Sequence, residues 1–447
     1  MGPMTQQRMP RILIVGGGYV GLYTAQRLQK KLRRTDVRIT VVDPRSYMTY
    51  QPFLPEAAAG SLEPRHVVVP LRRTLKHCQV ITGRVSRISH ADKVARIEPH
   101  VGNAYDLSYD ILVMAVGSIA RTLPIPGLAE FGIGFKQVEE AIALRNHVLD
   151  RLDVAASMAD DEIRRRALSF VVVGGGYAGV EAMAELQDMA VDALRYYPYL
   201  KREHMRWVLV EAANRILPEV GEEMGRYTVE QLTRQGIEVR LNTRLESCID
   251  GQIVLDDGTK FDADTLIWTA GVKANPVLAD TDLPLDDRGR LRCNADLSVV
   301  GVKDAWGAGD CAAVPDLTSD EPGATTSPSA QHAVRQAKHL GDNIAAVCRG
   351  GEPTDYRHRH VGSVASLGLH QGVAYVYGIK LKGIIAWFMH RTYHVSRMPT
   401  FNRKVRIILD WTLALFFRRE AVSMGRIHVP HDEFRAAAVP PRSDRSD

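Results

Sequence analysis

The stretch Arg11-Ile-Leu-Ile-Val-Gly-Gly-Gly-Tyr-Val-Gly21 decides the fold class of this chain. Its apolar run ends in the pattern Gly16-x-Gly18-x-x-Gly21, and a segment of helical character follows. This order predicts a strand, a tight turn and a helix. We expect Gly16 to make the turn, Gly18 to let the backbone approach a pyrophosphate, and Gly21 to bring the helix close to the strand. The first amides of the helix would then face the phosphates, whose charge the helix dipole favours.

An acid follows at the place where a ribose-binding residue belongs. The strand-like run Arg38-Ile-Thr-Val-Val-Asp43 ends in a carboxylate. In dinucleotide-binding units, an acid at the end of the second strand binds ribose hydroxyls. A GxGxxG pattern alone carries little weight, but the ordered series of strand, glycines, helix, strand and acid favours a dinucleotide-binding unit.

The same unit recurs later in the chain. Ser169-Phe-Val-Val-Val-Gly174-Gly-Gly176-Tyr-Ala-Gly179 is a near-copy of the first motif, and the run Trp207-Val-Leu-Val-Glu211 again ends in an acid. Each unit closes on an apolar strand and a glycine, with 101 positions from Gly16 to Gly117 and 97 from Gly174 to Gly271. The sequence therefore predicts two tandem dinucleotide-binding units of similar length.

Composition narrows the class of protein. At 447 residues the chain is long enough for two to four domains. Its five cysteines are scattered without a CxxC pair, which argues against a disulfide framework, a metal site or a dithiol centre and favours a reducing cytoplasm. The formal net charge of +5 is small, and we expect no nucleic-acid partner. No apolar run approaches the ~20 residues that span a bilayer, and residues 1–10 lack the apolar core of a signal peptide.

The tail differs in kind from the rest of the chain. Between Lys380 and Arg419 there are nine Lys or Arg residues and one acid, so nine minus one gives this stretch a charge of +8. Large apolar side chains interleave with the basic ones at helical spacing, and Pro399 is expected to separate two helices. Such helices suit an anionic membrane surface. The same apolar faces would also suit a dimer interface.

Shorter segments carry further predictions. Residues 78–118 have the pattern of several short strands, with turns at Gly83 and Gly102. Ser327 and Pro328 are placed to begin a helix, the first as its cap and the second in its first turn. The loop 48–55, with two prolines and two aromatics, either lines a cofactor site or packs, and its sequence favours neither alternative.

Together these motifs resemble the two-dinucleotide flavoprotein superfamily typified by glutathione reductase. Within it, the chain is most similar to the type II NADH dehydrogenases, the single-subunit, non-pumping NADH:quinone oxidoreductases. The similarity covers about residues 11–425, and the double GxGxxG and Gly-Ala-Gly-Asp310 are common to the superfamily. The narrower marks are Tyr50-Gln-Pro-Phe-Leu-Pro-Glu, Gly-Val-Glu181, Ala330-Gln331-x-Ala333 and a tail reading Ala386-Trp, Arg391-x-Tyr393 and Asp410-Trp411.

The resemblance implies an α/β fold of two Rossmann-like dinucleotide-binding domains, as in glutathione reductase, plus a C-terminal amphipathic helical region for membrane association. It implies FAD on the first unit, NADH on the second and a quinone pocket near the tail. Glu181 would lie near flavin and nicotinamide and serve NADH binding or the coupling of hydride transfer to quinone reduction, and Gln331 would contact the quinone. The residues expected to hold the nucleotides are Gly16, Gly18, Tyr19, Val20, Gly21, Asp43, Pro52, Val85, Ala115, Gly117, Gly174, Gly176, Gly179, Glu211, Gly271, Gly309, Asp310, Ala330 and Gln331.

Two positions bear on substrate choice. The family pattern is usually Ala-Gln-x-Ala-x-Gln, whereas this chain has Arg335 in the last place, followed by Gln336. Glu211 should accept hydrogen bonds from the adenosine ribose and repel a 2′-phosphate, which favours NADH over NADPH. Arg215 follows closely enough to weaken that preference.

The expected organisation follows from the resemblance. Residues 9–120 would form the first part of the FAD-binding domain, 121–285 the NADH-binding domain, 286–350 the second part of the FAD-binding domain, 351–430 the C-terminal region with its amphipathic helices, and 431–447 a disordered tail. The protein would sit peripherally on the cytoplasmic face of the cell membrane, with quinone and the lipid surface as partners and a homodimer as the alternative use of the tail.

Three other functions remain open on the sequence. A sulfide:quinone oxidoreductase needs two redox cysteines beside the flavin, and the scattered thiols offer no clear pair. A ferredoxin-type reductase would not need the basic apolar tail. A non-catalytic NADH-sensing flavoprotein would use the tail to dock on partners, and would not turn over with a quinone.

Overall fold

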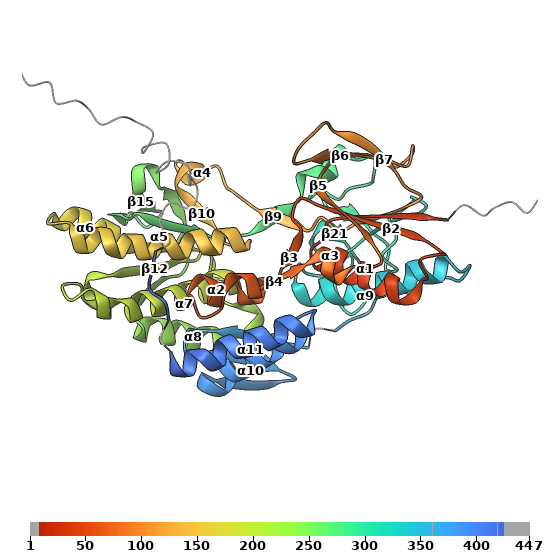
Figure 1. The fold of residues 1–447 in the computed structure, drawn as a ribbon. Coiled ribbons are helices and arrows are strands. Elements are labelled where there is room, and N and C mark those ends of the chain that lie inside the picture. The colour runs from red at the N-terminus through yellow and green to blue at the C-terminus, as the bar shows by residue number, and fades with distance from the viewer. Residues whose placement is uncertain (1–8, 360, 418, 424–447) are drawn as a thin grey trace, which may run out of the picture.

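The computed structural model describes residues 9–359, 361–417 and 419–423. Figure 1 shows two lobes joined by a pair of short strands, with two C-terminal helices lying below both lobes. The predicted α/β class with two Rossmann-like folds is confirmed by two separate sheets, one in each lobe, each with at least five parallel strands. The segment 431–447, which is predicted to be disordered, lies outside the described residues.

The first lobe is built on a seven-stranded sheet in the order β20-β8-β1-β2-β5-β6-β7. The strands are β1 Arg11–Val15, β2 Arg38–Asp43, β5 Gln79–Ser89, β6 Val94–Pro99, β7 Tyr105–Ser108, β8 Ile111–Met114 and β20 Ala305–Gly307. The first five in sheet order run parallel, and β6 and β7 are antiparallel additions. Because β20 comes late in the sequence, the chain leaves this lobe and returns to it. Helices α1 (Tyr19–Lys31) and α9 (Ala330–Val347) pack side by side below the sheet (Figure 1).

The second lobe repeats the plan with a five-stranded parallel sheet in the order β10-β17-β11-β12-β13. Its strands are β10 Gly132–Gly134, β11 Ser169–Val173, β12 Arg206–Val210, β13 Ile237–Arg240 and β17 Thr265–Trp268, and its helices are α5 Val138–Ser157, α6 Asp161–Ala167, α7 Tyr177–Ala193 and α8 Glu222–Arg234. A small antiparallel sheet of β14 (Leu245–Ser247), β15 (Gln252–Leu255) and β16 (Lys260–Asp262) lies beside it.

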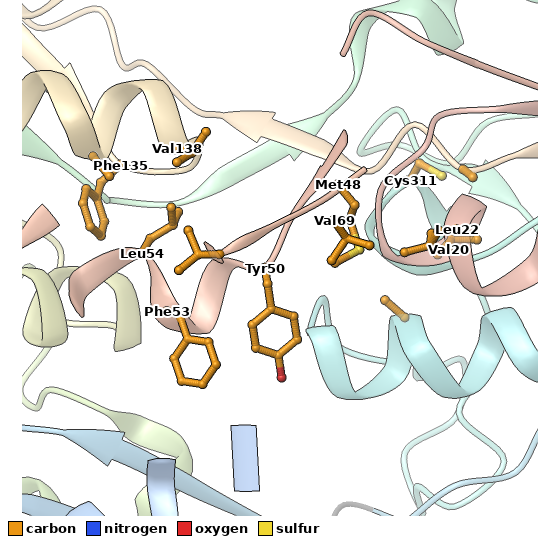
Figure 2. Packing of buried hydrophobic residues seen from close by; sticks show 14 of the residues in the cluster. Val20, Leu22, Met48, Tyr50, Phe53, Leu54, Val69, Phe135, Val138 and Cys311 are labelled. Atoms are coloured by element: carbon orange, nitrogen blue, oxygen red, sulfur yellow. The ribbon is translucent and has the colours of Figure 1, made fainter. Parts of the chain in front are cut away.

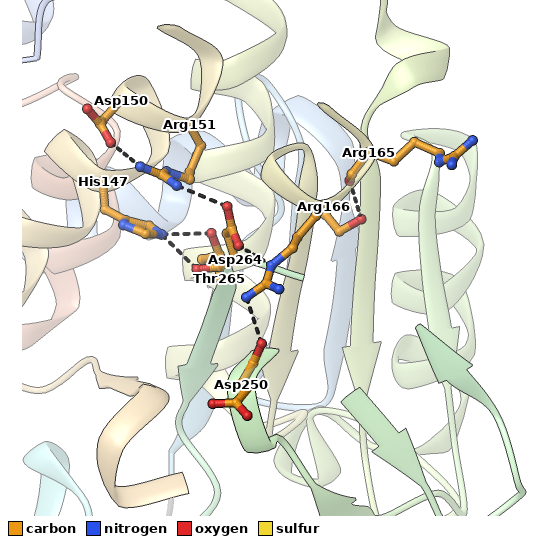
Figure 3. Close-up of polar contacts among 9 residues, drawn as sticks. His147, Asp150, Arg151, Arg165, Arg166, Asp250, Asp264 and Thr265 are labelled. Carbon is orange, nitrogen blue, oxygen red and sulfur yellow. Dashed lines mark hydrogen bonds and ion pairs between the residues drawn. The ribbon is translucent and has the colours of Figure 1, made fainter. Parts of the chain in front are cut away.

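Asp264 anchors two helices of the second lobe at the start of β17 (Figure 3). Its Oδ2 accepts a hydrogen bond from Arg151 of α5 at 2.9 Å, and its Oδ1 accepts one from Arg166 of α6 at 2.6 Å. His147 of α5 reaches the next residue, with Nε2 2.9 Å from Thr265 Oγ1. Charge-assisted bonds to a shared carboxylate therefore fix α5 and α6 relative to the sheet.

The connections between the lobes pair with each other. Strand β9 (Ser118–Ala120) leaves the first lobe, β18 (Val272–Ala274) leaves the second, and the two form an antiparallel pair. Trp268 supports the crossing, because its Nε1 donates to the Arg121 carbonyl at 2.8 Å. Smaller elements complete the lobes: β4 Val68–Pro70, α3 Leu71–Thr74, α4 Leu128–Phe131, β19 Leu291–Arg292 and β21 Ala312–Ala313.

The loop 48–55 is a packing element between the lobes and the tail (Figure 2). It follows β3 (Tyr47–Thr49) and leads into α2 (Leu54–Ala58), which contacts α5 and α7 of the second lobe. Tyr50 and Phe53 are buried, and the Phe53 ring lies 5.7 Å from that of Trp411 in the tail. The loop therefore packs, and its predicted place beside a cofactor, including the role of Pro52, stays a prediction.

The C-terminal region consists of a three-stranded antiparallel sheet and two helices. Strands β22 (Gly362–Ser366), β23 (Gly372–Val376) and β24 (Ile379–Lys382) lead into α10 (Gly383–Arg397) and α11 (Phe401–Phe416). Pro399 lies between the two helices, as predicted. Among the described helices, none combines the length and the apolar character needed to cross a membrane.

The turn predicted at Gly83 is wrong. Gly83 lies inside β5, where a Cβ would come within 2.8 Å of the Glu98 carbonyl oxygen on β6. The glycine allows the two strands to approach rather than reversing the chain. Gly102, with a φ of +96°, lies in the connection between β6 and β7 as predicted.

Candidate functional site

The first glycine turn has the tight geometry that its sequence predicts. Gly16 has a φ of +105°, and a Cβ on it would lie 2.3 Å from the Ala115 carbonyl oxygen. A Cβ on Gly21 would lie 1.8 Å from the Gly16 carbonyl oxygen, so α1 can approach β1 only with glycine at this position. Both glycines are required by the turn itself.

Gly18 differs from its two neighbours because it faces open space. A Cβ there would meet no atom within 4 Å, and Gly18 is the residue that caps the start of α1. Gly117, at the end of the neighbouring strand with a φ of +63°, is equally open. We call the open space in front of Gly18 and Gly117, at the amino end of α1, the first cradle. It fits the pyrophosphate of a dinucleotide, since free amides and the helix dipole both face it.

Asp43 stands at the end of β2 beside this cradle. Its Oδ2 accepts the Gly17 amide at 2.6 Å, and its Oδ1 accepts the Arg45 amide at 2.7 Å. Burial raises the pKa of Asp43, opposed by these two amides and by the Arg45 guanidinium. The carboxylate is thus fixed at the glycine turn, with acceptor capacity left for ribose hydroxyls.

The second glycine turn reproduces the first in detail. Gly174 has a φ of +116°, and a Cβ on Gly179 would lie 1.9 Å from the Gly174 carbonyl oxygen. Gly176 caps α7, and a Cβ there would again meet nothing within 4 Å. Gly271, with a φ of +87°, is the open counterpart of Gly117. The sequence repeat is therefore a repeat of site geometry.

Glu211 takes the place of Asp43 in this second cradle. Its Oε2 accepts the Gly175 amide at 2.6 Å and its Oε1 the Ala213 amide at 2.7 Å. A cavity of about 460 Å³ opens just beyond it. Its lining comes from the residues after the acid and from α8, namely Asn214, Arg215, Ile216, Glu222, Gly225, Arg226, Val229 and Leu241.

Asp310 lies where the chain has returned to the first lobe. Its Oδ2 accepts a hydrogen bond from Ser118 Oγ at 2.7 Å, and Lys136 of the second lobe donates to the same hydroxyl at 2.7 Å. Burial lowers the pKa of Lys136, partly offset by the Asp310 and Glu140 carboxylates. A lysine from one lobe therefore faces the acid of the other, and the sequence motifs gave no sign of Ser118 or Lys136.

Helix α9 begins two residues later than predicted. Ser329 caps it by accepting the His332 amide at 3.2 Å, so the predicted start at Ser327 and Pro328 is wrong. Gln336, which follows the departure from the family pattern, is buried and accepts the Gly309 amide at 2.7 Å. Gly309 itself has a φ of +73°. Gln336 therefore supports the Gly-Asp310 turn from within the core.

Gln331, in the first turn of α9, is held by the chain that leads into β22. Its Oε1 accepts from His358 Nε2 at 3.0 Å and lies 3.4 Å from the Val361 amide, and its Nε2 donates to the Gly362 carbonyl at 3.4 Å. Arg335 turns back along the helix and donates to the Gln331 carbonyl at 3.1 Å. Gln331 thus has a defined orientation.

Glu181, in α7, lies at the other end of β22. Its Oε1 accepts the Ser366 amide at 2.8 Å and lies 3.0 Å from Nε2 of His390 on α10. Burial lowers the pKa of His390, but the Glu181 and Glu56 carboxylates outweigh burial and leave it raised. The structure does not bring Glu181 and Gln331 into direct contact, but a single strand, β22, binds both.

Two further buried carboxylates are paired with cations of the tail. Glu56, at the end of the loop motif, accepts from Arg391 at 3.0 Å and from Trp411 Nε1 at 2.7 Å. Glu185, one turn after Glu181, lies 3.6 Å from the Arg419 guanidinium. Neither pairing has a sequence signal, because each joins residues hundreds of positions apart.

The remaining predicted residues have simpler places. Tyr19 and Val20 begin α1, Val85 is a buried residue of β5, Ala115 follows β8, Pro52 lies in a short turn before α2, and Ala330 is the first residue of α9. Val20 also packs on Gly309, where a Cβ would lie 2.7 Å from a Val20 methyl group. Tyr19, Val20 and Ala115 thus lie at the first glycine turn.

The cysteines offer no reactive thiol at the first cradle. Cys311, next to Asp310, is buried, and burial raises its pKa to about 11. Burial raises the pKa of Cys293 well above its ordinary value. All five cysteines are free, and the described residues hold no cluster that would bind a metal ion.

The chain is similar to known proteins over most of its length. The pyridine nucleotide-disulphide oxidoreductase family matches residues 10–337. Curated relatives include a type II NADH:quinone oxidoreductase of Staphylococcus aureus, 31% identical over 87% of this chain and 94% of the relative, and one of Mycobacterium tuberculosis, 29% identical over 92% and 89%.

Solved structures agree on the fold. NDH2 from Plasmodium falciparum, solved in complex with NADH, has a TM-score of 0.85 and covers 93% of this chain and 100% of that one, at 19% identity. The sulfide:quinone oxidoreductase of Aquifex aeolicus has a TM-score of 0.68 at 17% identity, covering 92% and 96%. With two dinucleotide cradles in place and relatives of this kind along nearly the whole sequence, the chain belongs to the pyridine nucleotide-disulphide oxidoreductase family and, within it, to the type II NADH:quinone oxidoreductases.

Proposed function

We propose that this protein oxidises NADH by means of bound FAD and passes the electrons to a membrane quinone without pumping protons. The observation that carries the proposal is the pair of glycine turns, each with an open cradle and a fixed carboxylate, held in one chain by the β9–β18 crossing. One cradle holds the redox cofactor and the other holds its electron donor.

FAD fits the first cradle and NADH the second. Gly16, Gly18 and Gly21 with Asp43 bind the first dinucleotide, and Asp310 comes to it from the returning chain. Gly174, Gly176 and Gly179 with Glu211 bind the second. FAD supplies the two-electron chemistry that links the donor to the quinone. The protein's own part is to position both nucleotides and to tune the charge around them.

Glu181 acts on the NADH side of the flavin, and Gln331 acts on the quinone side. Glu181 serves NADH binding or the coupling of the two half-reactions, and its buried partner His390 balances its charge. Gln331 faces the quinone, with its amide oxygen already occupied by His358 so that an N–H remains to donate. Strand β22 sets the distance between them at roughly the length of a five-residue strand.

The C-terminal region provides the contact with the membrane. The exposed large apolar residues of β24, α10 and α11 and of the residue after α11 are Ile379, Ile384, Ile385, Phe388, Phe401, Val405, Ile408, Leu409, Leu413, Leu415, Phe416 and Phe417. Apolar faces of this size, interleaved with basic residues, suit helices lying in the surface of a bilayer. We place the protein peripherally on the cytoplasmic face of the membrane, and a homodimer through the same faces is the alternative.

The test is steady-state NADH oxidation with menadione and with a longer quinone, after anaerobic titration of the flavin absorbance with NADH. We expect NADH to bleach the flavin and quinone to restore its colour through many turnovers. Bleaching without turnover would point instead to an NADH sensor. Sulfide:quinone activity is disfavoured because the Cys311 thiol beside the first cradle stays protonated at neutral pH.

A further inference from the structure

Three basic residues lie where α1 and α9 of the first lobe meet the end of α10. Arg335 and Lys338 lie one turn apart on α9, and Arg397 is the last residue of α10. Lys338 and Arg397 are exposed, and Arg335 is half-buried. Arg335 is also the residue at which the chain departs from the family pattern. We call these three residues the basic corner.

Tyr23 of α1 is the centre around which the basic corner forms. Its hydroxyl donates to the Arg397 carbonyl at 3.0 Å, which fixes the end of α10 against α1. The Lys338 ammonium lies 5.7 Å from the centre of the same ring. Tyr23 therefore fixes the backbone at Arg397 beside Lys338, while the Arg397 guanidinium lies 5.3 Å from the centre of the Tyr393 ring.

Among the described residues no carboxylate forms an ion pair with the basic corner. The acid on this side of α9, Asp342, is already bound by Arg27 at 2.8 Å and by Lys31 at 3.3 Å. Burial lowers the pKa of Lys338, and the positive charges of Arg397, Arg335, Arg27 and Lys30 lower it further. The corner thus concentrates like charges without a counter-ion from the chain itself.

The basic corner adjoins the apolar surface of the tail. Arg397 precedes the α10–α11 turn, and Phe401, a residue that is 80% exposed, follows it. In Figure 1 this turn brings α10 and α11 close to α9 and α1 at the lower edge of the first lobe. If the acyl chains of a lipid lay against the apolar face of α11, its phosphate would come close to the three residues of the basic corner.

We propose that Arg335, Lys338 and Arg397 bind the phosphate of an anionic phospholipid headgroup and so orient the protein on the membrane. This rests on the proposed membrane contact of α10 and α11 and adds to it a specific ligand site that joins α9 of the first lobe to the end of α10. Guanidinium groups suit a phosphate because their planar N–H groups bind two of its oxygens together. An exposed apolar side chain beside the cations favours a lipid over free phosphate.

The test is co-sedimentation with vesicles of phosphatidylcholine and with vesicles in which about one third of the lipid is phosphatidylglycerol. Wild type should bind the anionic vesicles more tightly. R397Q should lose about fivefold in affinity for them, and K338Q/R397Q more, since each basic residue near a charged surface contributes about that factor. R335Q, which restores the usual family residue, should weaken binding in the same way.

R87Q is the matched control. Arg87 is an exposed arginine of β5, a strand that Figure 1 labels on the upper side of the first lobe, and its loss changes the net charge by the same amount. Equal losses in R87Q and R397Q would overturn the basic corner and leave only net charge as the cause. Flavin absorbance and the melting temperature show that each variant is folded.

The remaining outcomes separate the two proposals. Wild type that binds neither kind of vesicle would overturn the membrane contact of the tail. Wild type that binds both kinds equally would leave that contact intact and overturn the basic corner. Inorganic phosphate that raises the melting temperature of wild type but not of K338Q/R397Q, with no vesicle effect, would assign the corner to free phosphate and overturn the lipid.

Discussion

The carboxylate of Glu181 in the second lobe and the imidazole of His390 in the C-terminal region form a buried ion pair at 3.0 Å. Their side chains are only 7% and 2% exposed. Glu181 belongs to the helix that begins at the second cradle, whereas His390 belongs to a helix whose outer face is apolar. The tail therefore places the charge of His390 inside the protein, and it also carries an apolar face on the outside.

Replacing His390 with Phe should destabilise the protein, because Glu181 would remain buried without its cation. Breaking a buried pair from one side costs ~3–5 kcal/mol. The measurement is the free energy of unfolding in guanidinium chloride. E181Q/H390F should recover part of the loss, since it removes both charges. An H390F variant as stable as wild type would show that the pair contributes nothing.

The same pair predicts a dependence of stability on pH. Burial lowers the pKa of His390, but the Glu181 and Glu56 carboxylates outweigh burial and leave it above the ordinary value of 6.5. The native state thus binds this proton more tightly than the unfolded state. The stabilisation is complete below pH 6.5 and is lost as the pH rises through the raised pKa.

Two charged or titratable neighbours of His390, Arg391 and His394, also influence how stability depends on pH. Arg391 opposes the charge of His390, and burial together with the charge of His390 lowers the pKa of His394 well below its ordinary value. We therefore expect the stability difference between wild type and E181Q/H390F to be largest at about pH 6 and to shrink as the pH rises. Urea titrations across this range measure it, and a difference that grew with pH would refute the assignment.

The glycines of the second cradle offer a matched pair of substitutions. G176A adds a methyl group where nothing lies within 4 Å, so the protein should fold and keep its flavin but bind NADH more weakly. G179A places the methyl group 1.9 Å from the Gly174 carbonyl oxygen, so the second lobe should lose stability. Thermal unfolding and the KM for NADH separate the two effects. G176A with an unchanged KM would contradict phosphate binding at this turn.

The sequence predicted the parts of the structure that depend on local order. Strand, glycine turn, helix and terminal acid recur at fixed spacing, so both sheets and both cradles followed from pattern. The helix start was misplaced because Ser327 and Ser329 are both suitable caps and only the tertiary structure selects Ser329. Gly83 was misread because a glycine in a close strand contact and a glycine in a turn look alike in sequence.

The ion pairs between the tail and the buried carboxylates could not be predicted from the sequence, for a different reason. Glu56 with Arg391 and Glu185 with Arg419 join elements from opposite ends of the chain. No periodicity or spacing connects such residues, and their proximity follows only from how the tail docks on both lobes. Lys136 and Ser118 are only 18 positions apart, but they belong to different lobes, and their contact follows from how the β9 crossing sets the two lobes against each other.

Lys136 should be required for holding the flavin. In K136M the Ser118 hydroxyl loses its donor, and the Asp310 carboxylate, which accepts from the same hydroxyl, loses the positive charge beside it. Hydrogen bonds to charged groups contribute about 1.5–3 kcal/mol, which corresponds to roughly a tenfold to hundredfold weaker retention of FAD. Flavin absorbance after gel filtration measures the loss. K273M, at an exposed lysine of β18, is the control and should retain FAD like wild type.

Glu211 should decide between NADH and NADPH. Each of its oxygens already accepts one backbone amide, which fixes the carboxylate beside the second cradle and leaves lone pairs for ribose hydroxyls. A 2′-phosphate would meet a negative charge there. E211Q removes that charge and one of the acceptors, so NADH should bind more weakly and NADPH should be rejected less. We expect the ratio of kcat/KM for NADH to that for NADPH to fall about tenfold or more.

Arg215 provides the counterpart to this substitution, because it lines the cavity just beyond Glu211. If a 2′-phosphate reaches this cavity in E211Q, Arg215 is the cation that would receive it, and E211Q/R215Q should lose the gain in NADPH use. Stopped-flow reduction of the flavin by each nucleotide measures the donor step without the quinone. A ratio that stays at the wild-type value in E211Q would mean that the specificity for the nucleotide lies outside the end of β12.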